Sequence, residues 1–211
     1  MNQQTVQFKN DLNGYLSEVQ NIQDNYTLHK YIMEKTSVKE DLNALNKAPA
    51  FFTLPTHSFQ YTVIMGLAKF IEPPRTRGEA KSLSKFLNFL EANHSYIFSN
   101  DPLEMERLGR TTPIDASTVS SHKTILEEME SIISHLITWR DKSFAHNDSA
   151  YFVDRSRLAT DYPITYGEIE RLIGFAIEML NTYNVGFSGS VRSFELTNIN
   201  DVDNVLRALK L

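Results

Sequence analysis

The stretch 121-SHKTILEEMESIISHLITWRDKSF-144 carries the most regular apolar pattern of the sequence and decides the fold class. Along it, apolar side chains recur at steps of four, three, four and three residues: Ile125, Met129, Ile132, Leu136 and Trp139. Steps of three and four residues place side chains on one face of an α-helix. We therefore predict a helix over 121–144 whose apolar face packs against other helices.

The same helical spacing extends over most of the remaining sequence. It predicts further helices over 4–34, 37–46, 50–71, 79–98, 166–183 and 201–210, with a break near 24–25 left open. Ser37 with Glu40, and Thr165 with Glu168, have the spacing of capping boxes that start helices. Asp101-Pro102 is expected to start a short helix that Gly109 ends, and Asn200 to cap the last helix.

No segment alternates apolar and polar residues over more than a few positions, so no β-sheet is expected, and 185–196 is interpreted as a connector. Short connections between helices favour antiparallel packing. The predicted fold class is therefore all-α. We expect an antiparallel helical bundle with an N-terminal helical extension, organised as a single domain over 1–211.

Composition excludes several kinds of site. The sequence has 211 residues, a net charge of −5 and no cysteine. It therefore has no disulfide, no thiolate nucleophile and no zinc site with cysteine ligands. The charge lacks the basic footprint of a protein that coats DNA, although a small basic cleft stays open. The polar N-terminus and the short, interrupted apolar stretch 59–71 predict a soluble, cytoplasmic protein without membrane contact.

A second stretch, 137-ITWRDKSFAHNDSAYF-152, gathers the chemistry-bearing residues. Arg140 continues the apolar stripe, where a charge is costly unless it is paired or faces a cleft. Two plainer interpretations stay open: an arginine stem whose head reaches water, and a cation at the negative end of the helix dipole. Six steps of about 100° put His146 about 120° away from Arg140 on a regular helix. The two side chains can therefore meet only if the helix ends or kinks, or if a second copy contributes one of them.

An arginine and a histidine suffice for metal-free cleavage of RNA. The imidazole of His146 would take the proton of a ribose 2′-hydroxyl, and the guanidinium of Arg140 would stabilise charge on the phosphorus. Asp141 would orient either partner. Lys142, Arg155 and Arg157 are candidates for attracting the RNA backbone. Four arginines flank the motif in sequence and are expected to line its cleft: Arg107, Arg110, Arg155 and Arg157. The six histidines lack metal-ligand spacing and no nucleotide-binding glycine motif is present, so we expect no metal and no cofactor.

The string 140-RDKSFAH-146 resembles the signature of the HEPN superfamily, in which an arginine precedes a histidine by four to six residues and an Asn, Asp or His stands next to the arginine. The upstream segments 51-FFTLPTHSFQYTVIMGLAKFIEP-73 and 82-SLSKFLNFL-90 resemble the abortive-infection (Abi) branch of that superfamily. The resemblance covers about 45–185, which would form the HEPN-like core.

This resemblance implies a helical bundle that forms a homodimer, in which two motifs face a shared cleft. It implies a metal-independent ribonuclease acting on single-stranded RNA in phage defence or in a toxin–antitoxin system. Arg140 and His146 would be catalytic, Asp141 would support them, and any antitoxin would be a separate protein. A hypothesis of a different class stays open: a non-catalytic helical module that binds RNA or a protein partner.

Overall fold

The structure is a computed structural model of the whole chain, and it describes residues 2–73, 81–111, 113–145, 148–154 and 156–210. Within these ranges the chain forms eleven α-helices and one π-helical turn, η1, and no β-strand. The prediction of an all-α helical bundle is therefore confirmed. None of the helices in these ranges is both long enough and apolar enough to cross a bilayer.

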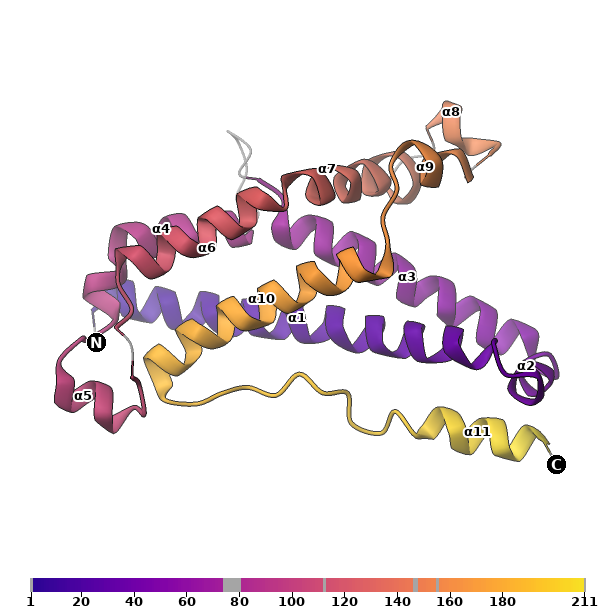
Figure 1. Cartoon of the computed structure of the whole chain (residues 1–211), viewed down its shortest axis with the longest axis horizontal. Coiled ribbons are helices and arrows are strands. Elements are labelled where there is room, and N and C mark those ends of the chain that lie inside the picture. The colour runs from indigo at the N-terminus through magenta and orange to yellow at the C-terminus, as the bar shows by residue number, and fades with distance from the viewer. Residues whose placement is uncertain (1, 74–80, 112, 146–147, 155, 211) are drawn as a thin grey trace.

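Figure 1 shows the order of the helices along the chain. They are α1 (Gln3–Lys35), α2 (Lys39–Leu45), α3 (Pro49–Ile71), α4 (Leu83–Ile97), α5 (Pro102–Arg107), α6 (Ala116–Glu128), α7 (Glu130–Trp139), η1 (Arg140–Phe144), α8 (Ser149–Phe152), α9 (Ser156–Asp161), α10 (Tyr166–Ser188) and α11 (Asp201–Lys210).

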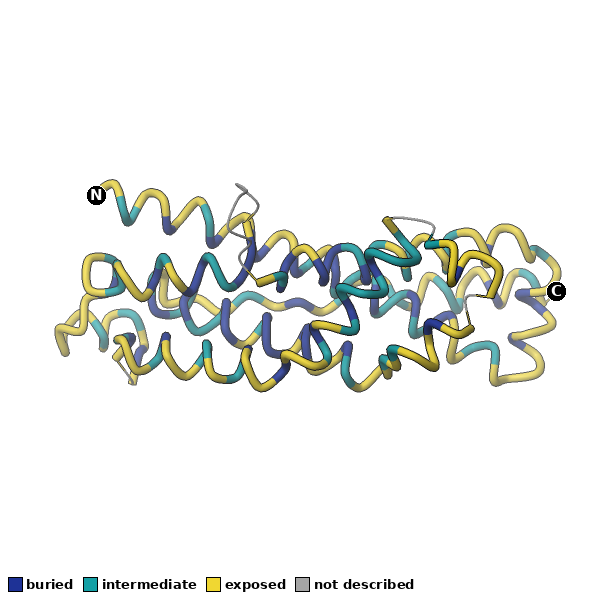
Figure 2. The backbone as a smooth tube through the Cα atoms, turned by 90° about the horizontal axis from the view of Figure 1, so that it is seen from above, coloured by how far each residue is buried: buried dark blue, intermediate teal, exposed yellow. Residues whose placement is uncertain are grey.

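The N-terminal helix α1 packs one face against three other long helices. It is unbroken across 24–25 and packs against α3, α4 and α10. Phe8, Leu12, Val19 and Ile22 of α1 are at most 2% exposed and belong to the main hydrophobic core. The sequence predicted an extension at this end; in the structure α1 contributes one face to the main core. Figure 2 shows buried positions running along the inside of the long helices.

A second, smaller hydrophobic cluster closes one end of the bundle. After α10 the chain runs back along the bundle as an extended segment to reach α11, which lies beside α2 (Figure 1). Leu206 of α11 is 1% exposed and packs in this cluster. The other buried members are Ile32, Ala44, Leu45 and Phe52. The end of α1 and the start of α3 are thus held together by the last helix.

Some predicted helix starts are confirmed and one is wrong. Thr165 and Glu168 form a full capping box at the start of α10, and the Asp101 side chain caps α5. By contrast, the residue before α2 is Val38, with no side-chain cap. The N–H groups of Ser37 and Val38 still donate to carbonyls at the end of α1. Ser37 therefore belongs to the turn that ends α1, and its predicted capping box does not form.

The helix predicted over 121–144 begins at Ala116, because Asp115 caps it through the N–H groups of Ser117 and Thr118. It is also divided into α6, α7 and η1. The first division is at Met129, whose φ of −96° and ψ of 8° leave the α-helical region. Met129 is nevertheless fully buried, so the apolar stripe passes through the irregularity. The second division creates the turn that carries Arg140.

The His122–Tyr183 pair predicts how stability depends on pH. The hydroxyl of Tyr183, which is fully buried, lies 2.8 Å from His122 Nδ1, and burial lowers the pKa of His122. As pH falls through the ordinary imidazole pKa of about 6.5, the unfolded chain therefore binds more protons than the folded chain, and stability is lost. We expect His122→Gln to reduce the fall in unfolding free energy between about pH 7.5 and about pH 6, measured by urea denaturation.

The control variant for this measurement is His94→Gln. The Nδ1 of that ring lies 3.3 Å from the Leu90 carbonyl oxygen and 3.2 Å from the Glu91 carbonyl oxygen, both on its own helix α4. If His94→Gln changed the pH slope as much as His122→Gln, the buried pair would not be its source.

Candidate active site

The helix that carries Arg140 ends in a π-turn. The Ala145 N–H donates to the Arg140 carbonyl at 2.7 Å, a bond that spans five residues. Single π-turns are rare and are found frequently at functional sites. The helix ends at Phe144. Such an end, or a second copy of the chain, is what the sequence requires for the side chains of Arg140 and His146 to meet. His146 and Asn147 lie outside the described residues, so the predicted meeting of the two side chains stays a prediction.

The guanidinium of Arg140 is bound by two carboxylates. Its Nη1 lies 2.8 Å from Glu72 Oε2 and its Nη2 lies 3.3 Å from Glu72 Oε1. Its Nε donates to Asp141 Oδ1 at 2.7 Å. The residue is only 7% exposed. The bond to Asp141, followed by the bonds to Glu72, raises the pKa of Arg140 against the opposing effect of burial. Arg140 is therefore a buried, permanently charged group.

These contacts decide between the interpretations left open for Arg140. A snorkelling arginine would hold its head in water, whereas this head is buried against carboxylates. The structure instead satisfies the requirement that a charge on the core side of a helix be paired. Among the described residues, the Arg140 cation is thus held between two anions.

Glu72 was missed by the sequence analysis. It directly follows α3, a 23-residue helix with a largely apolar sequence. The C-terminal end of a helix dipole disfavours a carboxylate, so an acidic residue at this point was a signal that a cation lies nearby. Because α3 packs against α7 and η1, Glu72 and Arg140 are brought together from positions 68 residues apart.

Lys142 does not share the Arg140 cluster. Its Nζ lies 3.1 Å from Asp148 Oδ2 and 5.0 Å from the centre of the Tyr151 ring. Asp148 also caps α8 by accepting the Ala150 N–H. The bond to Asp148 raises the pKa of Lys142. Lys142, predicted to attract RNA, therefore also links the π-turn to α8.

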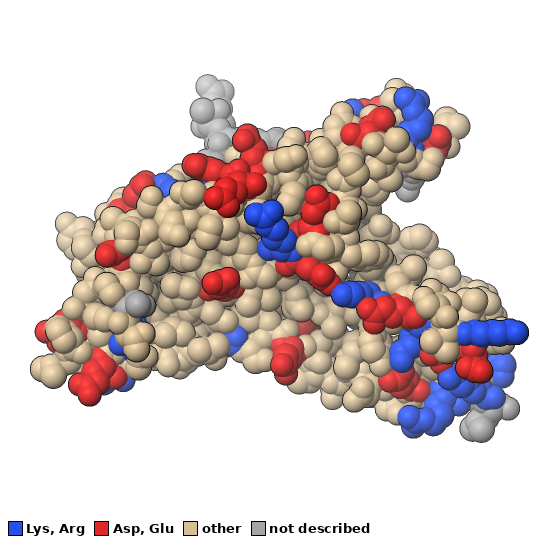
Figure 3. Space-filling model, viewed as in Figure 1, with Lys and Arg blue, Asp and Glu red and all other residues tan. Residues whose placement is uncertain are grey.

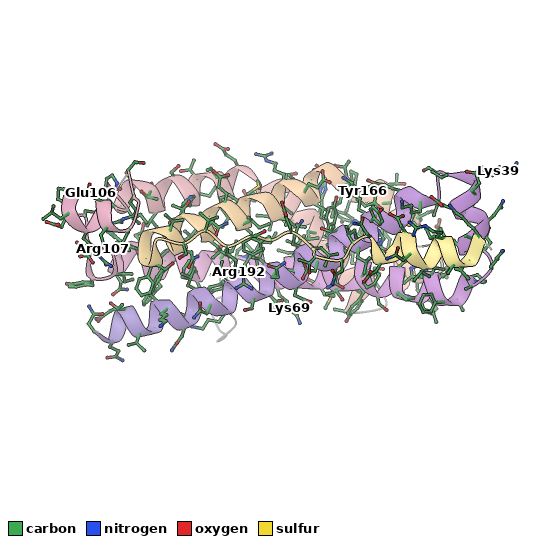
Figure 4. All side chains as sticks on the ribbon, turned by 90° about the horizontal axis from the view of Figure 1, so that it is seen from below. Lys39, Lys69, Glu106, Arg107, Tyr166 and Arg192 are labelled. Atoms are coloured by element: carbon green, nitrogen blue, oxygen red, sulfur yellow. The ribbon has the colours of Figure 1, made fainter. Side chains whose placement is uncertain are left out.

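The four arginines expected to line the cleft fall into two groups. Arg157 is exposed on α9, in the same projecting arm as η1 and α8, while Arg155 lies outside the described residues. Arg107 and Arg110 are different. α5, with Arg107, lies at the opposite end of the bundle from η1 (Figures 1 and 4), and Arg110 is buried with a bond to the Ser99 carbonyl. The expectation that these two line the same cleft is wrong, because α6 and α7 run the length of the bundle between them and the motif.

Aromatic side chains also pack at the π-turn η1. Trp139 donates its Nε1–H to the Tyr162 carbonyl at 2.7 Å. Phe144 packs between Trp139, with ring centres 6.4 Å apart, and Tyr61 of α3, at 5.7 Å. Trp139 also lines a cavity of about 200 Å³ between α1, α3, α7 and α10, together with Tyr166 at the start of α10. These contacts fix the turn on α3.

Surface charge is mixed on the face shown in Figure 3. Acidic side chains are interspersed with basic ones, and the densest basic group lies at the α2 and α11 end. The arm of α8 and α9 is therefore not a uniformly basic surface on that face. Within the described ranges, no three His, Asp or Glu side chains gather as metal ligands.

Comparison with known proteins gives one match. The sequence model of the family HEPN_AbiU2, described as AbiU2, matches residues 8–207. The matched range takes in α1 and most of α11, as well as the Arg140 motif. Neither curated proteins nor solved structures gave a match.

The burial of the Arg140 ion pairs predicts a loss of stability when the guanidinium is removed. Breaking a buried pair by removing one partner leaves charge without compensation and costs about 3 kcal/mol or more. We expect Arg140→Ala to lower the free energy of unfolding by about 3 kcal/mol, measured by chemical denaturation. Lys142→Ala, which breaks a more exposed pair on the same turn, should cost much less. A loss below about 1 kcal/mol for Arg140→Ala would contradict the structural role of this pair.

Proposed function

Because this chain belongs to the AbiU2 family, in the abortive-infection branch of the HEPN superfamily, we propose that it is a metal-independent endoribonuclease. It cleaves single-stranded RNA in phage defence or in a toxin–antitoxin system. The observation that carries the proposal is the buried Arg140, which two carboxylates hold on a π-turn six residues before His146.

The proposed reaction uses two groups of the chain. His146 takes the proton of a ribose 2′-hydroxyl, and the 2′-oxygen attacks the adjacent phosphorus. The bond from phosphorus to the 5′-oxygen breaks and a cyclic phosphate remains. The leaving 5′-oxygen takes a proton from a solvent water, and the imidazolium of His146 returns its proton to the hydroxide so formed. Arg140 stabilises the charge that builds on the phosphorus oxygens, because its planar fork matches them.

The remaining predicted residues have supporting roles in the proposal. In the free chain, Asp141 holds the guanidinium through its bond to Nε. Lys142 and Arg157, both on the part of the chain that contains η1, α8 and α9, attract the RNA backbone, and Arg155 is proposed to act with them. Since long-range attraction to phosphates weakens with salt, binding by this group would be salt-dependent.

The proposal includes a homodimer that brings two motifs to one cleft. An apolar stripe on α3 supports it: Phe51 is 64% exposed, Leu54 67% and Tyr61 47%. Steps of three and seven residues keep these side chains on nearly one face of the helix. The Tyr61 ring contacts Phe144 of the π-turn, so the stripe reaches the motif. A second copy on this stripe would bury it and set a second Arg140 turn beside the first.

A non-catalytic module is the second candidate, and one observation favours it. Two carboxylates occupy Arg140, so its hydrogen-bond donors are engaged before any phosphate arrives. In this alternative Arg140 holds η1 on α3, and the chain binds RNA or a protein partner. If the chain is a toxin, its antitoxin is a separate protein.

An RNA-cleavage assay separates the two candidates. We expect the purified protein to cut a single-stranded RNA in the presence of EDTA, because neither proposed group needs a metal. His146→Ala should reduce the rate by about 10²-fold or more, since it removes the general base. Its circular dichroism and oligomeric state should match the wild type. Equal cleavage by the variant would assign the activity to a contaminant or another site.

The apolar stripe predicts the effect of a charge on dimerisation. Leu54→Glu should weaken the dimer by at least about tenfold in dissociation constant, because the carboxylate would be buried at the interface. Size-exclusion chromatography with light scattering would measure this. The matched control is Leu103→Glu on α5, which is 77% exposed and lies at the opposite end of the bundle (Figure 1). A dimer weakened equally by both variants, or by neither, would contradict an interface on this stripe.

A further inference from the structure

The two carboxylates at Arg140 occupy different edges of its guanidinium. Glu72 binds Nη1 and Nη2 together, which is the end of the fork. Asp141 binds Nε, which with Nη2 forms the side of the fork. A guanidinium makes its strongest contacts with carboxylate and phosphate through two parallel N–H groups of one edge. With Glu72 and Asp141 in place, neither edge offers a phosphate two unoccupied donors.

The two carboxylates differ in how firmly they are held. Glu72 makes two bonds to the guanidinium and its side chain is 20% exposed. Asp141 makes a single bond and its side chain is 45% exposed. An exposed carboxylate loses less when it turns to water, because water replaces its hydrogen bond. Asp141 is therefore the one that an incoming anion displaces.

Glu72 and Asp141 also differ in the backbone segment that carries each of them. Glu72 directly follows α3, whose last residues Phe70 and Ile71 are at most 2% exposed. This places Glu72 on the rigid part of the bundle. Asp141 lies on the π-turn itself, beside the residue whose guanidinium it covers. One carboxylate thus comes from the scaffold and the other from the turn.

We propose that Glu72 is a positioning residue, which holds Arg140 by the end of its fork so that the side edge faces the RNA phosphate. Asp141 covers that edge in the free chain, and a phosphate oxygen takes its place on Nε when RNA binds. This proposal rests on the proposed function, whose site it deepens. The two acidic residues thereby have opposite effects: Glu72 supports catalysis, and Asp141 competes with the substrate.

The test for Asp141 uses a probe that cannot be cut. A single-stranded oligonucleotide with 2′-deoxyribose has the same phosphates but no 2′-hydroxyl to attack. We expect Asp141→Asn to bind it about tenfold more tightly than the wild type, because a competing charged hydrogen bond is lost. The matched control is Glu130→Gln, which removes an exposed charge at the start of α7 and should change affinity much less. Binding by Asp141→Asn that is unchanged or weaker, or a gain equalled by Glu130→Gln, would overturn the role of Asp141.

The test for Glu72 separates kcat from KM on single-stranded RNA. Glu72→Gln has nearly the same shape but cannot accept a hydrogen bond through both terminal atoms, because its Nε2 is a donor. We expect its kcat to fall about 10²-fold, with KM changed by no more than about threefold, because a misplaced guanidinium fails mainly in the transition state. Glu72→Asp retains the charge on a shorter arm and should restore part of kcat. Since this conservative variant also retains an ion pair, it keeps the test valid if Glu72→Gln unfolds.

Two results would overturn the role of Glu72. One is a Glu72→Gln variant that cleaves as fast as the wild type or faster, which would make Glu72 a competitor like Asp141. The other is a Glu72→Asp variant that remains folded and has no more activity than Glu72→Gln. Failure of the proposed function looks different: the wild type would not cut RNA, while the ¹⁵N signal of Arg140 Nε–H would still move when the 2′-deoxy oligonucleotide binds. If that signal does not move although the oligonucleotide binds, Asp141 is not displaced and this inference fails.

Discussion

The bidentate contact between Arg140 and Glu72 is the interaction on which the site depends. Burying a permanently charged guanidinium within a helical bundle is costly unless an anion accompanies it. Here the anion comes from the end of α3, while the cation comes from the turn after α7. The pair therefore balances charge and also fixes how η1 is oriented relative to α3, on which η1 packs. Any chemistry at Arg140 begins from an arginine whose stem and head are both fixed.

The π-turn is the second constraint, and it explains how a motif with unfavourable helical spacing can still act as a site. An i to i+5 bond between Ala145 and Arg140 widens the helix by one residue in its last turn and then ends it. Phe144 contributes by packing between Trp139 and Tyr61. The side chains that stabilise the turn thus come from α7 and α3, and the turn ends at Phe144. The ion pair between Lys142 and Asp148 then guides the chain into α8.

Much of the fold could be predicted from the sequence, because apolar periodicity and capping chemistry are local. The Thr165–Glu168 box and the Asp101 cap are examples in which residues three positions apart contain the whole signal. Ser37 shows the limit: its sequence context is that of a cap, but the end of the preceding helix uses its N–H group. On a regular helix Arg140 and His146 point in different directions, so the sequence could predict a break in the helix near them but not that the break is a π-turn. Glu72 could not be assigned to Arg140 from spacing, since packing between helices brings the two together.

The position of α11 determines when one end of the hydrophobic core can be completed during synthesis. Glu72 and Arg140 both precede α10 in the chain, whereas Leu206 completes the cluster that joins the end of α1 to the start of α3. A ribosome therefore delivers both partners of the Arg140 pair well before the residue that seals the α2 end of the bundle. During that interval Ile32, Leu45 and Phe52 lack the apolar partner that covers them in the finished protein. The nascent chain thus contains its candidate catalytic arginine before α11 has been made to cover the smaller hydrophobic cluster.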